Sequence, residues 1–373
     1  MRIPLSSPDI SPEDVEAVVA VLNSRWLSLG PQVEAFEAAA AEVAGRAHGV
    51  AVNSGTSALH LGVEALGLPP GTEVITTPFS FVASANCLLF CGLKPVFVDI
   101  DPDTYNVDPD QVEAAITPRT GAILGVDVFG QPARWDRLTR IAEQHGLRLI
   151  EDSAEAIGAT YLGRPAGGWG DFGVFAFYPN KQMTTGEGGV LVTDDARIAA
   201  HARSARNQGR GEGGAWLLHE RLGYNFRLSE LHSALGLSQI ARLPQLLARR
   251  AEVAGWYDAR LGGVRDLHLL GRDPDARISW FVYVVRLGGR FAQADRDRVI
   301  AEMRGHGIQC SNYFAPIHLQ PFYREMGFCP GQFPVTESVG ARTLALPFFN
   351  RLSEAEADEV ADRLLAVAGL ERG

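Results

Sequence analysis

The stretch HGVAVNSGTSALHLGVEALGLPPGTEVITT, residues 48–77, decides the fold because a strand, a helix and a second strand follow one another in it. The apolar run HGVAVN predicts the first strand, TSALHLGVEALG has the periodicity of a helix, and EVITT predicts the next strand. Two strands joined through a helix are expected to lie parallel in one sheet. If this unit recurs along the chain, it predicts an α/β fold.

The same alternation continues through residue 152. Short apolar runs predict further strands at 95–100, 121–128 and 147–152. Helical patterns lie between the strands at 81–92, 108–116 and 133–146. The fold class is therefore predicted to be α/β, with a mostly parallel sheet and helices on both of its faces.

The ends of the chain differ from this central region. Helices are expected before it at 11–24, with Ser11 as the N-cap, and at 31–45, ending near Gly45. After Leu228 the sequence predicts helices at 228–243, 244–262, 294–305 and 353–368, and a strand at 280–287. We interpret this as a large domain of residues 1–244 and a smaller C-terminal α/β domain of residues 245–373.

The composition argues against several classes of protein. A net charge of −10 argues against a basic surface for nucleic acid, so no nucleic-acid partner is expected. No stretch reaches the ~18 apolar residues of a membrane helix, and no secretory signal is visible. The four cysteines form no CxxC pair, which argues against a zinc site and a disulfide framework. We expect no metal, no membrane partner and a cytoplasmic location.

The loop after the first strand has the features of a phosphate site. Gly55, Thr56 and Ser57 are expected at the start of a helix, where free backbone N–H groups, the helix dipole and two hydroxyls attract anions. The alternative is that the hydroxyl residues are ordinary N-caps.

Aromatic and acidic residues follow two other strands. Phe79 and Phe81 could stack on a planar ring or simply pack in the core. Glu151, Asp152 and Glu155 follow an apolar run, where a carboxylate could pair with a protonated ring nitrogen. A metal ligand or an N-cap is the alternative for these acids.

Lys181 lies in FYPNKQMTTGEGGV, residues 177–190, and Lys94 is the only other lysine among 34 basic residues. A lysine can lose its proton and form a Schiff base with a carbonyl group, which arginine cannot do. The alternative is a solvated surface charge. A phosphate cradle, a stacking aromatic ring, a carboxylate for a ring nitrogen and a Schiff-base lysine together predict a site for pyridoxal phosphate.

Five stretches resemble, in order, the motifs of one family. They are NSGTSAL, PFSFVASAN, EDSAEAIGA, NKQMTTGEGG and LGYNFRLSE. The family is that of the DegT/DnrJ/EryC1/StrS sugar aminotransferases, and the resemblance extends from WLSLGPQVEAFE to YFAPIHLQPFYR, residues 26–324. It implies a pyridoxal-phosphate-dependent transferase of fold type I with a seven-stranded sheet. It also implies a homodimer with active sites at the subunit interface.

The resemblance further implies roles for single residues. Lys181 would be the internal-aldimine lysine, and Asp152 would contact the pyridine nitrogen. The remaining cofactor contacts would come from Glu155 near the phenolic oxygen, Phe81 on the ring, Gly55 and Thr56 with Ser57 at the phosphate, and Asn225 at the phosphate in the partner subunit. His318 and Tyr313 would bind substrate, although a surface-loop histidine is the alternative for His318.

Two positions depart from the pattern of many relatives. Ala176 stands where a phosphate-binding serine is common, so phosphate binding would rest on residues 55–57, on Asn225 or on water. Glu155 stands where glutamine or histidine is frequent, and an acid there resembles the perosamine-synthase branch. That branch aminates C4 of a nucleotide-linked 4-keto-6-deoxy sugar.

The activity implied is transamination from L-glutamate to the keto group of a nucleotide-linked 4-keto-6-deoxy sugar. Lys181 would act as general base and acid, and Asp152 would keep the ring nitrogen protonated. One alternative is an aminotransferase of the same fold that acts on a cyclitol or another non-nucleotide ketone. Another is a non-catalytic sensor that binds pyridoxal phosphate.

Overall fold

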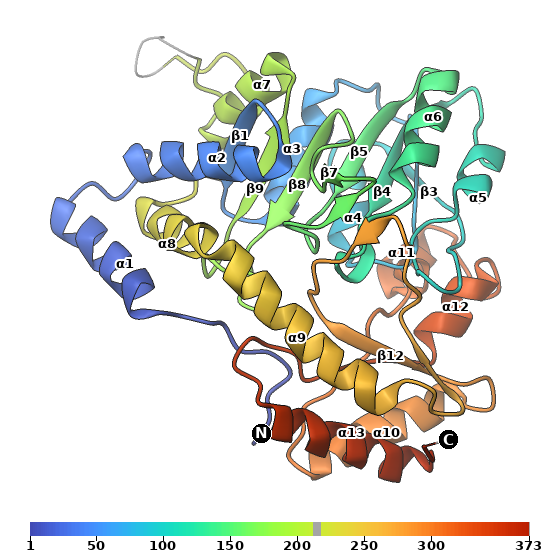
Figure 1. Ribbon diagram of the computed structural model, residues 1–373. Coiled ribbons are helices and arrows are strands. Elements are labelled where there is room, and N and C mark those ends of the chain that lie inside the picture. The colour runs from blue at the N-terminus through green and yellow to red at the C-terminus, as the bar shows by residue number, and fades with distance from the viewer. Residues whose placement is uncertain (212–217, 373) are drawn as a thin grey trace.

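The computed structural model describes residues 1–211 and 218–372. Its centre is a seven-stranded sheet in the order β1-β9-β8-β5-β4-β2-β3 (Figure 1). The strands are β1 His48–Val52, β2 Glu73–Thr76, β3 Lys94–Phe97, β4 Thr120–Val126, β5 Arg148–Asp152, β8 Phe172–Ala176 and β9 Gly189–Thr193. Within this sheet β9 alone is antiparallel to its neighbours, so the predicted mostly parallel sheet is confirmed.

Helices cover both faces of the sheet because successive residues of each strand point to opposite sides. Leu149 of β5 belongs to the same buried cluster as Trp135 of one helix layer, whereas Ile150 belongs to the cluster that contains Leu59 of the other. The first layer contains α2 Pro31–Ala44, α5 Pro109–Ala114, α6 Trp135–His145 and α8 Glu230–Ala241. The second contains α3 Gly55–Ala65, α4 Ala83–Phe90 and α7 Ala196–Arg206.

The strands β8 and β9 are the part of the sheet that was not predicted from individual residues. Each is a five-residue run, FGVFA and GVLVT, that is apolar almost throughout. A short run of this kind has no alternation that separates a buried strand from a piece of buried helix. The predicted strands and helices of residues 11–152 are all present.

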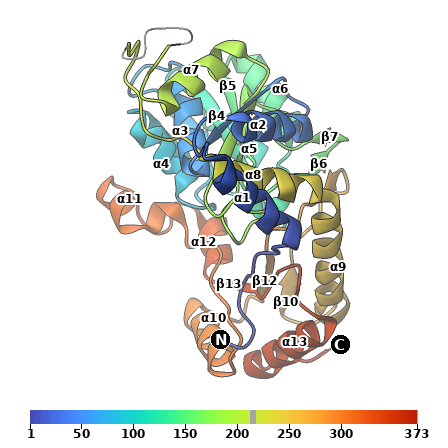
Figure 2. The same cartoon turned by 90° about the vertical axis from the view of Figure 1, so that its left-hand side faces the viewer.

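The C-terminal part contains a three-stranded antiparallel sheet in the order β10-β12-β13. Figure 2 shows this sheet beside α9, α10 and α13, away from the large sheet. The bounds are β10 Leu267–Leu269, β12 Tyr283–Leu287, β13 Thr343–Leu346, α9 Leu243–Leu261, α10 Gln293–Gly305 and α13 Glu354–Ala368.

The fold also contains a second small sheet and several short helices. A second three-stranded sheet joins β6 Thr160–Tyr161, β7 Arg164–Pro165 and β11 Ala276–Arg277. The short helices are α11 Pro321–Glu325, α12 Pro334–Gly340 and the 3₁₀ turns Val128–Gly130 and Ile317–Leu319. No helix within residues 1–211 and 218–372 is both long and apolar enough to cross a membrane.

The N-terminal segment before α1 Pro12–Ser24 lies against the C-terminal part. Ile3 forms a parallel bridge with Ile308, and the carbonyl of Leu5 accepts a hydrogen bond of 2.9 Å from the N–H of Phe348. The predicted large domain of residues 1–244 therefore begins with residues that pack on the other predicted domain. The boundary at residue 245 stays a prediction.

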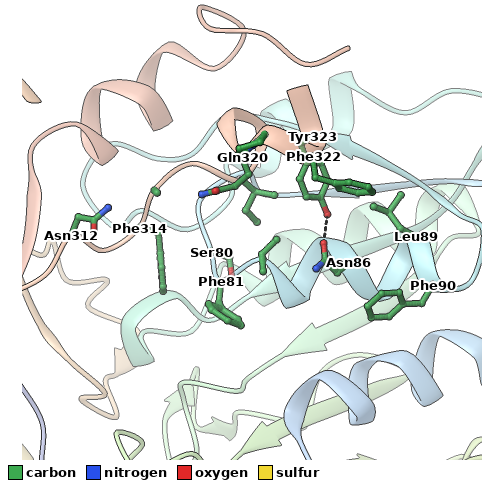
Figure 3. A pocket seen from close by; sticks show the side chains of 14 residues that line it. Ser80, Phe81, Asn86, Leu89, Phe90, Asn312, Phe314, Gln320, Phe322 and Tyr323 are labelled. Carbon is green, nitrogen blue, oxygen red and sulfur yellow. Dashed lines mark hydrogen bonds between the residues drawn. The ribbon is translucent and has the colours of Figure 1, made fainter. Parts of the chain in front are cut away.

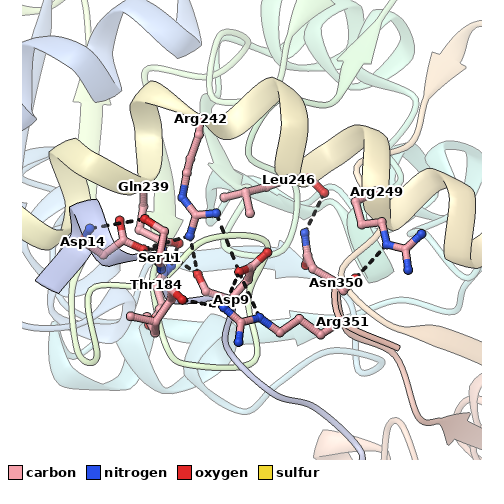
Figure 4. A network of polar contacts seen from close by, with 11 residues as sticks. Asp9, Ser11, Asp14, Thr184, Gln239, Arg242, Leu246, Arg249, Asn350 and Arg351 are labelled. Carbon is pink, nitrogen blue, oxygen red and sulfur yellow. Dashed lines mark hydrogen bonds and ion pairs between the residues drawn. The ribbon is translucent and has the colours of Figure 1, made fainter. Parts of the chain in front are cut away.

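A polar network holds this segment in place (Figure 4). Buried Asp14 accepts hydrogen bonds from Arg242 at 2.8 Å and from Gln239 at 2.6 Å. Asp9 lies 3.3 Å from the guanidinium of Arg351. The start of the chain is thus connected both to α8 and to the loop before α13.

The N-terminus of α2 is capped from another helix. Glu230, at the start of α8, is 1% exposed. Its carboxylate accepts hydrogen bonds of 3.0, 3.0 and 2.9 Å from the backbone N–H groups of Gly30, Gln32 and Val33. Three backbone donors that lack partners within α2 are satisfied in this way, so one carboxylate joins α2 to α8.

We predict that Glu230→Gln destabilises the protein. The glutamine amide keeps one acceptor oxygen but turns an N–H donor toward backbone donors, so at least one buried hydrogen bond is lost. The free energy of unfolding should fall by about 1–3 kcal/mol, measured by urea denaturation followed by circular dichroism. The exposed Glu42→Gln in α2 should change it by less than about 0.5 kcal/mol, and equal losses in both variants would contradict the prediction.

Candidate active site

A cavity of about 460 Å³ lies where the parallel strands of the large sheet end. Strand ends or the loops after them supply its walls: Gly55 after β1, Ser80 after β2, Val126 of β4, Asp152 of β5 and Ala176 of β8. This is the edge at which open parallel sheets bind ligands. Of the predicted site residues, those that line the cavity are Gly55, Thr56, Phe81, Asp152, Glu155, Lys181 and Tyr313.

The start of α3 forms one wall. Ser54 caps the helix, and its hydroxyl accepts a hydrogen bond of 3.1 Å from the N–H of Ser57. A Cβ atom on Gly55 would lie 2.7 Å from the Cβ of Ala176, so glycine permits the close approach of α3 and β8. The N-cap of α3 is therefore Ser54, which was not predicted as a site residue, and neither Thr56 nor Ser57 takes that place.

Ser57 is placed differently from Gly55 and Thr56. It is 8% exposed and is not among the residues that line the cavity. Its hydroxyl donates a hydrogen bond of 2.7 Å to the side chain of Asn53. The predicted contact of Ser57 with a phosphate has no support from this position.

Asp152 is held at the floor of the cavity and is 4% exposed. Ser84 of α4 donates a hydrogen bond of 2.7 Å to its Oδ2, and the N–H of Ala154 lies 3.2 Å from Oδ1. The hydroxyl of Ser80 lies 2.8 Å from that of Ser84. Burial raises the pKa of Asp152, although these hydrogen bonds and the charge of Lys181 oppose the rise.

Lys181 and Glu155 lie side by side in the lining of the cavity. Lys181 Nζ lies 3.5 Å from Glu155 Oε1 and 3.9 Å from the ring centroid of Phe281. The other oxygen of Glu155 accepts a hydrogen bond of 3.0 Å from the N–H of Phe129. Burial raises the pKa of Glu155, and the charge of Lys181 opposes this rise. The amine is thus close to a buried carboxylate and to the face of an aromatic ring.

Aromatic residues surround the mouth of the cavity. Phe81 is 61% exposed, whereas Phe79 is fully buried against Tyr105 and Phe129, as the core-packing alternative expects. Figure 3 shows Phe81, Ser80 and Phe314 around a neighbouring groove of about 870 Å³. These three residues line both the groove and the cavity, so the two adjoin.

The three remaining predicted residues, Tyr313, His318 and Asn225, lie in different surroundings. Tyr313 lines the cavity, and its hydroxyl lies 3.5 Å from the amide nitrogen of Asn180. His318 is fully buried, so it is not a surface-loop histidine; its Nε2 lies 3.0 Å from Glu337 Oε1, outside the cavity. Asn225 is exposed and does not line the cavity of its own chain. The predicted roles of His318 and Asn225 stay predictions.

The chain matches the DegT/DnrJ/EryC1/StrS aminotransferase family over residues 8–365. It is 39% identical to GDP-perosamine synthase of Caulobacter vibrioides, covering 96% of each chain. It is 38% identical to the spore coat polysaccharide biosynthesis protein SpsC of Bacillus subtilis, covering 96% of this chain and 95% of SpsC.

Among solved structures, the chain resembles the PLP form of Spr1654 from Streptococcus pneumoniae, which is described as a sugar aminotransferase. The TM-score is 0.94 at 28% identity, and the match covers 99% of each chain. The fold type inferred from the sequence motifs is therefore confirmed.

We predict that Asp152→Asn stabilises the protein without pyridoxal phosphate at neutral and alkaline pH. Because burial raises the folded-state pKa, folding of the ionised form costs free energy, and this cost grows as the pH rises above about 4. The free energy of unfolding at pH 8 should increase by about 1 kcal/mol, and the gain should shrink toward pH 4. Urea denaturation at several pH values measures this.

Asp136→Asn is the control with the opposite sign. Burial alone would raise the pKa of Asp136, but the hydrogen bond from Tyr161 and the charge of Arg134 lower it overall. Its ionised form therefore stabilises the fold above the unfolded pKa, and the asparagine should lose stability at pH 8. A loss of stability at pH 8 in both variants would contradict the prediction for Asp152.

Proposed function

This chain belongs to the DegT/DnrJ/EryC1/StrS aminotransferase family, whose cofactor is pyridoxal phosphate, and we propose its amino donor and its amino acceptor. The donor is L-glutamate, and the acceptor is the keto group of a nucleotide-linked 4-keto-6-deoxy sugar. The observation that carries the proposal is the position of the Lys181 amine. It lies 3.5 Å from Glu155, in a cavity that Asp152 also lines.

The residues of the cavity fit the cofactor. Gly55 and Thr56 supply free backbone N–H groups at the start of α3, which suit a phosphate in the absence of a hydroxyl at Ala176. Asp152 is buried without a cationic partner closer than Lys181 among the described residues, so a protonated ring nitrogen would complete its surroundings. Phe81, at the mouth, can stack on the ring.

Pyridoxal phosphate, when bound, supplies an aldehyde that condenses with amines and a ring that withdraws electrons from the adjoining carbon. Lys181 would hold the cofactor through its amine and, as a free amine, would be the base that takes a proton from the α-carbon of L-glutamate. Asp152, oriented by Ser84, would keep the ring nitrogen protonated. Glu155, which accepts a hydrogen bond from the N–H of Phe129, would lie near the phenolic oxygen of the cofactor.

The proposed acceptor is supported by two observations. The groove beside Phe81 and Phe314 adds about 870 Å³ to the cavity, which is room for a substrate larger than a monosaccharide. The acid at Glu155 and the relationship to GDP-perosamine synthase favour a nucleotide-linked sugar of the 4-keto-6-deoxy class. With SpsC as another relative, we propose a role in the biosynthesis of a polysaccharide.

We also propose that the enzyme is a homodimer with shared active sites. Asn225 is exposed and forms a bridge with Asn207 at the surface of the chain. An exposed amide that the family resemblance places at a cofactor phosphate can reach that phosphate only in another subunit.

The purified protein should be yellow and should lose this colour with L-glutamate as the cofactor takes up the amine. Nucleotide-linked 4-keto-6-deoxy sugars should then restore the original absorbance within one turnover, whereas cyclic ketones without a nucleotide should not. Absorbance spectroscopy over a panel of keto sugars and ketones measures both halves. In Lys181→Arg neither change should occur, because a guanidinium does not form the covalent bond.

Two outcomes would contradict this proposal in different ways. A protein that binds pyridoxal phosphate but keeps its colour with L-glutamate would be a sensor. A protein whose colour returns only with a cyclitol ketone would have the same chemistry and another substrate.

Hybrid dimers test the shared site. Asn225→Ala and Lys181→Ala chains should each be at least about 100-fold less active than the wild type when pure. Mixed under conditions that exchange subunits, they should regain up to about a quarter of wild-type activity, because in each hybrid one site receives both native residues. Steady-state rates measure the recovery, and a mixture no more active than its components would exclude a site built from two chains.

A further inference from the structure

Arg250, in the middle of α9, is a buried cation with no acidic partner within ion-pair distance in the described residues. The side chain is 2% exposed. The guanidinium instead faces the ring of Phe348, whose centroid is 5.3 Å away. Burial lowers the pKa of Arg250 to about 10, and the charge of Asp9 opposes this change. Because a buried charge without a counterion is costly, its retention calls for a function.

The hydrogen bonds of Arg250 join two segments of the cavity wall. Nη2 donates to the carbonyl of Lys181 at 2.8 Å and faces that of Asn180 at 3.5 Å. Nη1 donates to the carbonyl of Phe281 at 3.2 Å and faces that of Trp280 at 3.4 Å. One guanidinium therefore binds the backbone on which Lys181 stands and the backbone on which Phe281 stands.

The side chains of Lys181 and Phe281 are in contact in the cavity. Lys181 Nζ lies 3.9 Å above the ring of Phe281, a cation–π geometry. Lys181 lies in the loop between β8 and β9, residues 177–188, here called the lysine loop. The next residue in this loop, Gln182, also binds the segment before β12, since its Nε2 donates a hydrogen bond of 2.8 Å to the carbonyl of Ser279. The position of the amine thus depends on how the lysine loop is held against residues 279–281.

We propose that Arg250 is a positioning residue for Lys181. It fixes the carbonyls of Lys181 and Phe281 relative to each other and so sets where the amine lies above the Phe281 ring and beside Glu155. Arginine suits this position because its planar fork presents two N–H groups in different directions and its charge survives burial. This inference rests on the proposed role of Lys181 as the residue that binds the cofactor.

The experiment measures how fast Lys181 captures pyridoxal phosphate. Cofactor is removed from the wild type, Arg250→Met and Arg250→Lys, and stopped-flow absorbance follows formation of the covalent bond after pyridoxal phosphate is added. We expect capture by Arg250→Met to be about 10-fold slower or more, because the amine is no longer aimed. We expect Arg250→Lys to be slower by about 3-fold or more, since one ammonium cannot bridge both segments as the fork does.

Two further readouts separate positioning from general stability. The turnover number with L-glutamate should fall in the Arg250 variants while KM changes by less than about 2-fold, as expected when binding is intact and the reacting group is displaced. Arg249→Met is the matched control on the same helix. Arg249 binds the carbonyls of Asn350 and Leu352, away from the cavity, and Figure 4 shows it beside Asn350. This variant should keep the wild-type capture rate.

The outcomes are distinct. A lower melting temperature in Arg250→Met with an unchanged capture rate would mean that the residue only stabilises the fold, and would overturn the proposal. If Arg250→Met does not fold, wild-type capture by Arg250→Lys would overturn it equally. If borohydride reduction and mass spectrometry find no cofactor on Lys181 in the wild type, the proposed function fails first, independently of Arg250.

Discussion

Carboxylates and an amine can occupy a buried cavity only if each has partners there, and Asp152, Glu155 and Lys181 meet this requirement together. Burial alone raises the pKa of both acids, and the Lys181 charge opposes the rise at each of them. Neutral donors also stabilise the two carboxylates, because Ser84 donates a hydrogen bond to Asp152 and the N–H of Phe129 donates one to Glu155. Keeping these charges satisfied constrains the placement of three segments: α4, the turn at 128–130 and the lysine loop.

The strand alternation explains why neighbouring acids have different surroundings. Asp152 points into the cavity, whereas Glu151, one residue earlier, points to the opposite face of β5. There it accepts hydrogen bonds of 2.6 and 2.7 Å from the N–H groups of Gly167 and Trp169. Glu151 thus organises the loop before β8 and takes no part in the cavity. The two roles require that β5 keep its register with β4 and β8.

Much of the cavity was predictable because it gathers loops that follow successive strands. Gly55 and Asp152 are far apart in the chain, but the rule that ligands bind at the ends of parallel strands brings their loops together. Lys181 was instead predicted from its chemistry and from the motif around it, because the strand before it, β8, was not predicted. Ser84 was missed because a serine inside a helix has no signal that marks it as a partner of a distant carboxylate. Phe281 was missed because it lies in an apolar run, WFVYVVRL, that reads simply as a buried strand.

The residues predicted from the resemblance show a different limit. Motif position placed His318 near a substrate, but its buried contacts with Glu337 and Phe333 depend on tertiary packing that no local pattern contains. The proposed role of Asn225 depends on a second subunit, which would carry the phosphate that it contacts. The resemblance thus identified the chemistry of the chain more precisely than the surroundings of each side chain.

The strong preference for arginine over lysine has a physical meaning at this site. A guanidinium keeps its charge when buried, so Arg250 can bind backbone carbonyls beside the cavity with a pKa still about 10. An ammonium gives up its proton more readily, which is the property that covalent chemistry with a carbonyl requires. In the proposed function, Lys181 therefore stands where a proton has to move, and Arg250 stands where a charge has to remain. Arg250 donates a hydrogen bond of 2.8 Å to the carbonyl of Lys181, so in our proposal the permanent charge holds the reactive one in place.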